Sequence, residues 1–297
     1  MLQKTNIAQL VDLDLRYVGF AYGAPLNRAA LAGQIDVLLT ADQPAAALID
    51  KGARFRIVGR MMVNRTCLYT HPASRITAIE QLQRARVLGP TGAAAERVAL
   101  KLLADAKVDA KQLQWGDLDM AGQAALMRTE QGVWPGADAL YGFDPLPADW
   151  QARGKIRMLG CGPVSAFVLA SSDVIERRPE TLERFLKAFS LAWAWYAAQP
   201  QQANAWFREI SGLDVPDAAL EEAAAVEPNK SAKRLADVSL DVSAKDEAAF
   251  AEAAEFLRGK GLIGASFAAP PFAMQPYRAV RQSLPQWQSF ERRVAPR

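Results

Sequence analysis

The sequence predicts an α/β fold with largely parallel sheets, because one strand-to-helix turn recurs at three places along the chain. The apolar run "IDVLLT" at 35–40 leads into an alanine-rich segment, "ARVLG" at 85–89 leads into "PTGAAAERVALKLLADA", and "ADALYG" at 137–142 leads into "FDPLPADW". Short β-branched runs that alternate with helical segments are typical of βαβ units, whose strands pair in parallel.

The first turn predicts a helix over residues 44–51. Proline suits the first helical position, since its missing N–H would have no partner there, and Gly52 suits the position just past the last turn. Asp42 or Gln43 is then the N-cap, whose side chain accepts an amide of the first turn.

The other segments follow the same logic. At the second turn a strand ends at Val87-Leu88, and a helix over 93–106 has Val98, Leu102 and Ala106 on one face. The third strand runs into Phe143-Asp144-Pro145, and "RFRIVGRMMVNR" at 54–65 alternates like a strand with one solvated face. A helix over 179–198 carries apolar residues at a spacing typical of a core face: Leu182, Phe185, Phe189, Trp193 and Tyr196.

Composition limits the class of function. The chain has 297 residues, 51% of them hydrophobic, which is enough for two lobes of ordinary domain size. Its 35 basic and 32 acidic residues are interspersed, so no basic face for nucleic acid is expected. No apolar run approaches the roughly 20 residues of a membrane span.

Few side chains suit metal or nucleophilic chemistry. Cys67 and Cys161 belong to no cluster with metal-site spacing and are expected to be buried thiols. His71, the single histidine, lies in the turn-like stretch "YTHPAS". The first 18 residues lack the pattern of a secretory signal, so the protein is expected either to be cytoplasmic or to have lost a leader.

In an open α/β sheet, ligands bind where strands end and the following helices begin, because unpaired backbone N–H groups point outward there. Small residues at 40–41 and 92–94 would let a ligand approach the backbone.

Several motifs occur along the chain in an order that resembles the order in one known family. "LAGQIDVLLTADQPAAALIDKGARFRIVG", "SRITAIEQLQRARVLGPTGAAAERVALKLLADAKVD", "GADALYGFDP" and "FVLASSDVIERRPETLERFLKAFSLAWAWYAAQP" follow one another as in the solute-binding proteins of ABC importers for sulfonates, taurine, nitrate and pyrimidine precursors of thiamine. This group is called SsuA-like or NMT1/THI5-like, and the resemblance covers about residues 7–265.

The resemblance implies the two-lobe type II periplasmic-binding-protein fold, each lobe a mainly parallel sheet flanked by helices, with the ligand cleft between them. Lobe 1 would be residues 1–67 plus 168–297, and lobe 2 residues 68–167. Compared with the family, Met1 aligns inside the first helix and "LDLRYVGF" at 13–20 reads as the second strand, so the first strand is expected to be missing. The implied hinges are Thr66, Cys67, Leu68, Tyr69 and Ala166, Phe167, Val168, Leu169, Ala170.

The resemblance also implies a binding site in the three turns. Ala93 stands where the family often has serine, which removes one hydroxyl donor. Asp42 is expected to cap its helix, whereas Asp144 either caps a helix or faces the cleft and repels anions. Trp134 either stacks on a ring of the ligand or anchors its loop. The implied ligand-binding residues are Thr40, Ala41, Asp42, Gln43, Thr91, Gly92, Ala93, Ala94, Trp134, Tyr141, Phe143 and Asp144.

The expected function is therefore a non-catalytic binding component of an ABC importer, with no cofactor or metal. It would be a periplasmic monomer that binds a sulfonate-, taurine- or nitrate-like anion or a small aromatic such as a pyrimidine, and that docks on the permease. The alternatives are an enzyme on the same scaffold, of the pyrimidine-synthesising type, or a cytoplasmic ligand sensor.

Overall fold

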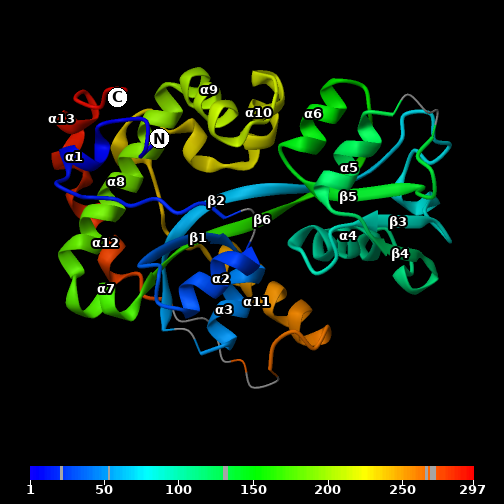
Figure 1. Ribbon diagram of the computed structural model, residues 1–297, viewed down its shortest axis with the longest axis horizontal. Helices are drawn as coiled ribbons and strands as arrows, with labels where there is room; N and C mark the ends of the chain where they lie inside the picture. The colour runs from blue at the N-terminus through cyan, green and yellow to red at the C-terminus, as the bar shows by residue number, and fades with distance from the viewer. Residues whose placement is uncertain (21–22, 53, 130–132, 265–266, 268–271) are drawn as a thin grey trace. The chain divides into compact units, whose positions relative to one another are not determined.

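The computed structural model describes residues 1–20, 23–52, 54–129, 133–264, 267 and 272–297, and the chain divides into two compact units (Figure 1). Unit 1 consists of Met1–Met62, Ser165–Leu213 and Glu227–Arg297, and unit 2 of Val63–Val164 and Asp214–Val226. Two long strands, β2 (Phe55–Thr70) and β6 (Arg157–Ser171), contribute residues to both units. The predicted α/β class is confirmed.

Unit 1 packs helices on both faces of its strands. Strand β1 pairs with β6 in an antiparallel ladder, in which Val37 lies opposite Ala170. One face is covered by α8 together with α1 and α12, and the other by α3 and α11 (Figure 1). The elements of unit 1 are α1 (Ile7–Leu10), α2 (Gly23–Leu31), β1 (Val37–Ala41), α3 (Asp42–Asp50), α7 (Ser172–Arg177), α8 (Pro179–Ala198), α9 (Pro200–Ser211), η4 (Pro228–Ser231), η5 (Leu235–Asp237), α11 (Ala244–Gly259), α12 (Gln275–Ser283), η6 (Leu284–Trp287) and α13 (Gln288–Glu291).

Unit 2 contains the parallel strands. Strand β3 pairs in parallel with β4 and β5, and β5 pairs antiparallel with β2. Side chains alternate along the strands, so that Val87 and Tyr141 pack toward α4 whereas Leu88 and Leu140 pack toward α5 and α6 (Figure 1). The elements of unit 2 are η1 (Ile79–Gln81), β3 (Arg86–Gly89), α4 (Ala94–Asp105), η2 (Ala110–Gln112), β4 (Gln114–Asp117), α5 (Met120–Met127), β5 (Ala139–Phe143), α6 (Leu146–Ala152), α10 (Asp217–Ala223) and η3 (Ala224–Val226).

Most predicted elements form close to where the sequence places them. The helix over 179–198 is α8, with Leu182, Phe185 and Phe189 buried in the core. The strand over 54–65 is the first part of β2; Arg56 is exposed as expected, but Arg60 is buried and forms an ion pair with Glu227. No described helix combines the length and apolar character that a membrane span requires.

Four expectations about elements are wrong. Helix α3 begins at Asp42, so Ala41 is its N-cap, because β1 leads into the helix with no loop between them. Pro44 then lies inside the first turn, where proline is still tolerated. Residues 13–20 form neither strand nor helix, although Leu13 and Leu15 pack on the core, and the first helix begins at Ile7 rather than containing Met1. The described ladder of unit 1 is antiparallel, because β6 runs opposite to β1.

The cysteines are not thiols. Cys67 and Cys161 form a disulfide, with their Cα atoms 4.1 Å apart, within unit 2. The two residues are 94 positions apart in the sequence, so only the folding of β2 and β6 brings them together. The segment Asp214–Val226, expected in lobe 1, lies in unit 2, where α10 packs on α6.

Candidate functional site

Three strand-to-helix turns of unit 2 lie at one edge of its parallel strands, the carboxyl edge. Strands β3, β4 and β5 end at Gly89, Asp117 and Phe143, and α4, α5 and α6 begin a few residues later (Figure 1). This edge presents the amino ends of helices, with their N–H groups and positive dipole ends, which is where α/β sheets bind ligands. The expected residues 91–94 and 143–144 belong to this edge.

Backbone N–H groups in the turn before α4 donate hydrogen bonds to carboxylates of the chain itself. The Thr91 N–H donates to Asp117 Oδ1 at 3.0 Å, and the Gly92 N–H donates to Glu96 Oε2 at 2.6 Å. Gly92 has a φ of +78°, which favours glycine. Glu96 is only 5% exposed, so its carboxylate is held inside the turn.

Tyr141 lies under this turn and is almost fully buried. Its ring makes an edge-to-face contact with Trp115 at 5.5 Å between centroids, and a Cβ on Gly89 would meet the Tyr141 ring at 2.5 Å. Burial, reinforced by the neighbouring Glu96 charge, raises the pKa of the Tyr141 hydroxyl, which also makes a hydrogen bond with Thr91. Tyr141 is therefore a packing residue of the edge whose ring face is covered.

The structure gives Asp144 two partners. Its Oδ1 accepts the Ala148 N–H of α6 at 3.0 Å, and its Oδ2 lies 2.5 Å from Nε of Arg65. Arg65 Nη2 also lies 3.0 Å from Glu222 Oε1 on α10. Burial raises the pKa of the Asp144 carboxyl, and the Arg65 hydrogen bond opposes that rise. Asp144 therefore both caps α6 and carries a neutralised charge.

Phe143 differs from the other aromatic candidates. It is 39% exposed at the end of β5, whereas Tyr141 is 1% and Trp134 is 5% exposed. Trp134 lies before β5, at the opposite end of the strands, and makes edge-to-face contacts with Tyr69 and His71 at 6.4 and 5.6 Å. The structure therefore places Trp134 as a loop anchor, away from the third turn.

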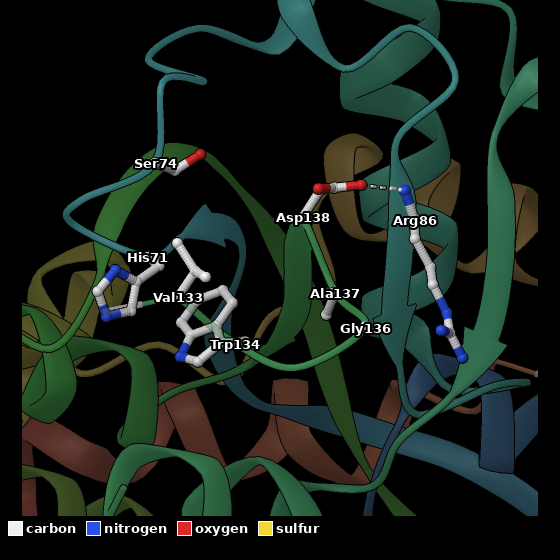
Figure 2. A pocket seen from close by; sticks show the side chains of 8 residues that line it. All are labelled: His71, Ser74, Arg86, Val133, Trp134, Gly136, Ala137 and Asp138. Carbon is white, nitrogen blue, oxygen red and sulfur yellow. Dashed lines mark hydrogen bonds between the residues drawn. The ribbon is translucent and has the colours of Figure 1, made fainter. Parts of the chain in front are cut away.

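A shallow pocket of about 250 Å³ lies beside Trp134, at the amino edge of the strands (Figure 2). Figure 2 shows Trp134 beside Val133 and His71, and the Asp138 carboxylate bonded to the backbone N–H of Arg86 at 2.8 Å. His71 Nδ1 accepts the Ala73 N–H, and burial lowers the pKa of the His71 imidazole. The pocket is lined by His71, Ser74, Arg86, Val133, Trp134, Gly136, Ala137 and Asp138.

In unit 1 the equivalent turn joins β1 to α3 and is tightly packed. The Gln43 N–H donates to Asp42 Oδ1 at 2.7 Å, and Asn27 Nδ2 donates to the Pro44 carbonyl at 2.8 Å. A Cβ on Gly23 would meet Pro44 at 2.5 Å, so α2 presses on the first turn of α3. Asp42 and Gln43 are 0% and 2% exposed, and both have further interaction partners. Thr40 is also buried, and Ala41 is half-buried.

Sequence reasoning missed several residues of the carboxyl edge. Asp119 caps α5 by accepting the Gly122 N–H at 2.7 Å, and "QWGDLDMAG" shows the strand and the Asp N-cap that predict this fourth turn. Glu96, in the first turn of α4, is a common acidic position for a cap. No local pattern indicates that Arg65 contacts Glu222, because 157 residues separate them. Among the described residues, no group of three or more His, Cys, Asp or Glu side chains could hold a metal ion.

Solved structures with similar folds include binding proteins and an enzyme. The alkanesulfonate-binding protein SsuA of Xanthomonas axonopodis pv. citri, bound to MOPS, is 19% identical with a TM-score of 0.68, covering 89% of this chain and 91% of its own. The periplasmic aliphatic sulphonate-binding protein SsuA of Escherichia coli is 20% identical with a TM-score of 0.71, covering 91% and 84%. The desulfurization enzyme DszB is 15% identical with a TM-score of 0.62, covering 94% and 93%.

At these identities the similarity shows the fold, which is that of two-lobe periplasmic binding proteins. A comparison with proteins of curated function finds no match. The NMT1/THI5-like family matches residues 11–203, which is more than half of the chain. The protein therefore belongs to the NMT1/THI5-like family.

Proposed function

We propose that the protein is the non-catalytic solute-binding component of an ABC importer and binds a small organic molecule. The observation that carries the proposal is the carboxyl edge of unit 2, where three helices begin beside an exposed aromatic side chain, Phe143, in a chain of this family. Binding uses the exposed Phe143 ring and polar groups of this edge, and it requires no covalent bond to break.

The proposed ligand class starts from the fold neighbours. The two SsuA proteins bind alkanesulfonates or aliphatic sulphonates, and one of them holds MOPS. Taurine, nitrate and thiamine-precursor pyrimidines enter the same panel of candidates, because the sequence motifs resemble binding proteins for all of them. The Phe143 ring favours a ligand with an apolar or aromatic portion.

We place the protein in the periplasm. The Cys67–Cys161 disulfide supports this location, because disulfides persist in oxidising compartments and are rare in the cytoplasm. Protein isolated from the periplasm without reductant should contain no titratable thiol, whereas cytoplasmic protein should contain two, since the chain has two cysteines. Two thiols in the native cellular protein would contradict the location.

We propose that the lobes move about the strands that pass between them and that a monomer presents the ligand-bound form to the permease. Residues 66–69 and 166–170 are the proposed hinges, and the boundaries between the units fall close by, after Met62 in β2 and after Val164 in β6. The chain also passes between the units on both sides of α10. Hinge motion in such clamps is absorbed by a few residues at element ends.

The alternative function is an enzyme on the same scaffold, because the fold is also similar to that of the desulfurization enzyme DszB. This chain's cysteines are joined in a disulfide, so neither offers a thiolate nucleophile. His71, the single histidine, lies at the amino edge of unit 2 rather than at the proposed site. Both observations support binding without chemistry.

The test is a thermal-shift panel of alkanesulfonates, taurine, nitrate and pyrimidines. A true ligand at 100 times its Kd should stabilise the protein by about 2.7 kcal/mol. Mass spectrometry of the bound molecule after prolonged incubation should recover it unchanged. Conversion of the bound compound to a product would instead show that the protein is an enzyme. If no compound of the panel stabilises the protein, the proposed role in binding these solutes is wrong.

A further inference from the structure

Arg65 lies at the carboxyl edge of unit 2, beside the end of β5. Its backbone carbonyl accepts the Asp144 N–H at 3.0 Å, and the neighbouring pair, Thr66 and Phe143, ends the β2–β5 ladder. Phe143 is the exposed aromatic residue of this edge. The Arg65 guanidinium, which contacts the Asp144 carboxylate, therefore lies where β5 ends and α6 begins.

The two carboxylates that bind Arg65 differ in how they are held. The Asp144 side chain is fully buried, with one oxygen on Nε of Arg65 and the other on the Ala148 N–H. The Glu222 side chain is 39% exposed, and among the described residues its carboxylate bonds to Nη2 of Arg65 alone, at 3.0 Å. Water can rehydrate an exposed carboxylate, whereas a buried one that loses its cation stays uncompensated. Asp144 is therefore the fixed counter-ion of Arg65, and Glu222 is the exchangeable one.

One edge of the Arg65 guanidinium is open to a ligand. Nε and Nη2 bind the two carboxylates, but Nη1 donates to no group in the described part of the chain. The buried side-chain nitrogens of the described residues that lack a partner do not include Nη1, so this atom is accessible to solvent. A guanidinium binds oxyanions best through two parallel N–H groups. An oxyanion on Nη1 and Nη2 therefore requires only that Glu222 leaves.

We propose that Arg65 is the anion-binding residue of the carboxyl edge and that Glu222 is a built-in competitor, which the sulfonate or other singly charged oxyanion of the ligand displaces. This inference rests on the proposed binding function and names the charge of the ligand and the residue that receives it. The exchange replaces one negative charge beside Arg65 with another, while Asp144 keeps the guanidinium oriented. A neutral head group cannot replace the charge of Glu222, so the exchange selects anions.

The test compares butanesulfonate with its neutral analogue butanesulfonamide, with Kd measured by titration calorimetry on the whole chain. Glu222→Gln should tighten butanesulfonate about fivefold, because the competing carboxylate is gone, and should change the Kd of butanesulfonamide by less than about twofold. A damaged fold would not tighten binding, and this variant keeps the buried pair between Asp144 and Arg65. Nitrate is the second anionic probe, with the same expected direction.

Arg65→Lys is the opposing variant. Lysine keeps the positive charge beside Asp144 but lacks the two parallel donors, so butanesulfonate should bind at least about tenfold more weakly. Glu80→Gln is the matched control, because it removes an equal charge from an exposed site of unit 2 that precedes β3. It should change each Kd by less than about twofold.

Three outcomes overturn the assignment to Arg65 while the binding function stands. The first is tighter binding of butanesulfonamide than of butanesulfonate by the parent protein. The second is an effect of Glu222→Gln on the anions no larger than that of Glu80→Gln. The third is binding confined to the uncharged pyrimidines of the solute panel. If neither these probes nor any compound of the panel binds, the proposed function fails and this inference fails with it.

Discussion

The two ends of the parallel strands in unit 2 are built differently. At the carboxyl edge, carboxylates accept hydrogen bonds from backbone amides, and a partly buried ion pair joins Asp144 to Arg65. At the amino edge, Trp134 packs against Tyr69 and His71 beside a shallow pocket. Both edges hold polar and aromatic residues, but α4, α5 and α6, in the part of unit 2 that the structure describes, all begin at the carboxyl edge. The comparison teaches that the direction of the strands, rather than the types of residue present, distinguishes the proposed binding edge from a packing edge.

The largest effect is expected at the amino edge. Trp134→Ala removes a side chain that is 5% exposed, and it should lower the free energy of unfolding by about 4 kcal/mol. Ligand affinity should be unchanged, since Trp134 lies away from the proposed binding turns. Urea denaturation measures the first quantity and calorimetry the second. Val133→Ala, at a 58% exposed neighbour, is the control and should cost less than about 0.5 kcal/mol. A loss of affinity in the folded Trp134→Ala protein would break the distinction between the edges.

Arg65→Ala should lower the free energy of unfolding by about 2 to 3 kcal/mol at neutral pH, because it leaves the buried Asp144 carboxylate without its cation. Burial already raises the Asp144 pKa and the Arg65 bond opposes the rise, so the variant should have a higher Asp144 pKa still. A carboxyl with a raised folded-state pKa gains stability below its unfolded pKa and loses it as pH rises through the folded value. The defect should therefore shrink toward about pH 4.

The matched variant for that series is Arg65→Ala combined with Asp144→Asn. With no carboxyl left to protonate at this position, the pH dependence of the difference from Asp144→Asn should disappear. Chemical denaturation at several pH values gives the comparison. A defect of Arg65→Ala that stays constant from neutral to acid pH would show that the ion pair contributes little at this edge.

Gly89→Ala should cost about 2 kcal/mol, because its Cβ would meet the Tyr141 ring at 2.5 Å and Trp115 packs against that ring. Gly136→Ala, at the amino edge, should cost only about 1 kcal/mol for its φ of +71°, since the nearest atom is the flexible Arg86 guanidinium. Thermal denaturation compares the two. If Gly89→Ala also weakens ligand binding and Gly136→Ala does not, the functional difference between the two edges is supported. Weaker binding by Gly136→Ala alone would contradict that difference.

The smallest effect is expected for Phe143→Ala. Because Phe143 is 39% exposed, its loss should change stability by less than about 1 kcal/mol but weaken ligand binding about fivefold. Thermal shift with the identified ligand measures both. Leu39→Ala, at a 38% exposed apolar residue of β1, is the control for loss of exposed apolar surface. Undiminished stabilisation of Phe143→Ala by the ligand would remove the aromatic contact from the site.

The elements that sequence predicted best are those that depend on local patterns. Helix α8 matches the predicted range, because its apolar spacing and its initial proline act within the segment. The start and the end of α4 were predicted to within one residue for the same reason. Helix α3 begins two residues before Pro44, since proline is compatible with several first-turn positions.

The site was only partly predictable. The turns at 91–94 and 143–144 were recognised, whereas the partners of their polar groups were not. Asp117 reaches Thr91 across 26 residues and Arg65 reaches Asp144 across 79, so no window of sequence contains either pair. Tyr141 and Phe143 lie two residues apart on β5, yet one is buried and the other exposed, because the end of the strand leaves the core.

By itself the sequence determined the α/β class, the positions of the main helices and strands, and the family of the chain. These properties depend on short-range periodicity and on the order of motifs. Only the tertiary structure decided that Cys67 and Cys161 form a disulfide and that residues 214–226 belong to unit 2. It also decided that the chain's own carboxylates accept hydrogen bonds from amides at the helix starts. The physical reason is that pairing, burial and charge compensation depend on distances between residues far apart along the chain, which a linear pattern does not encode.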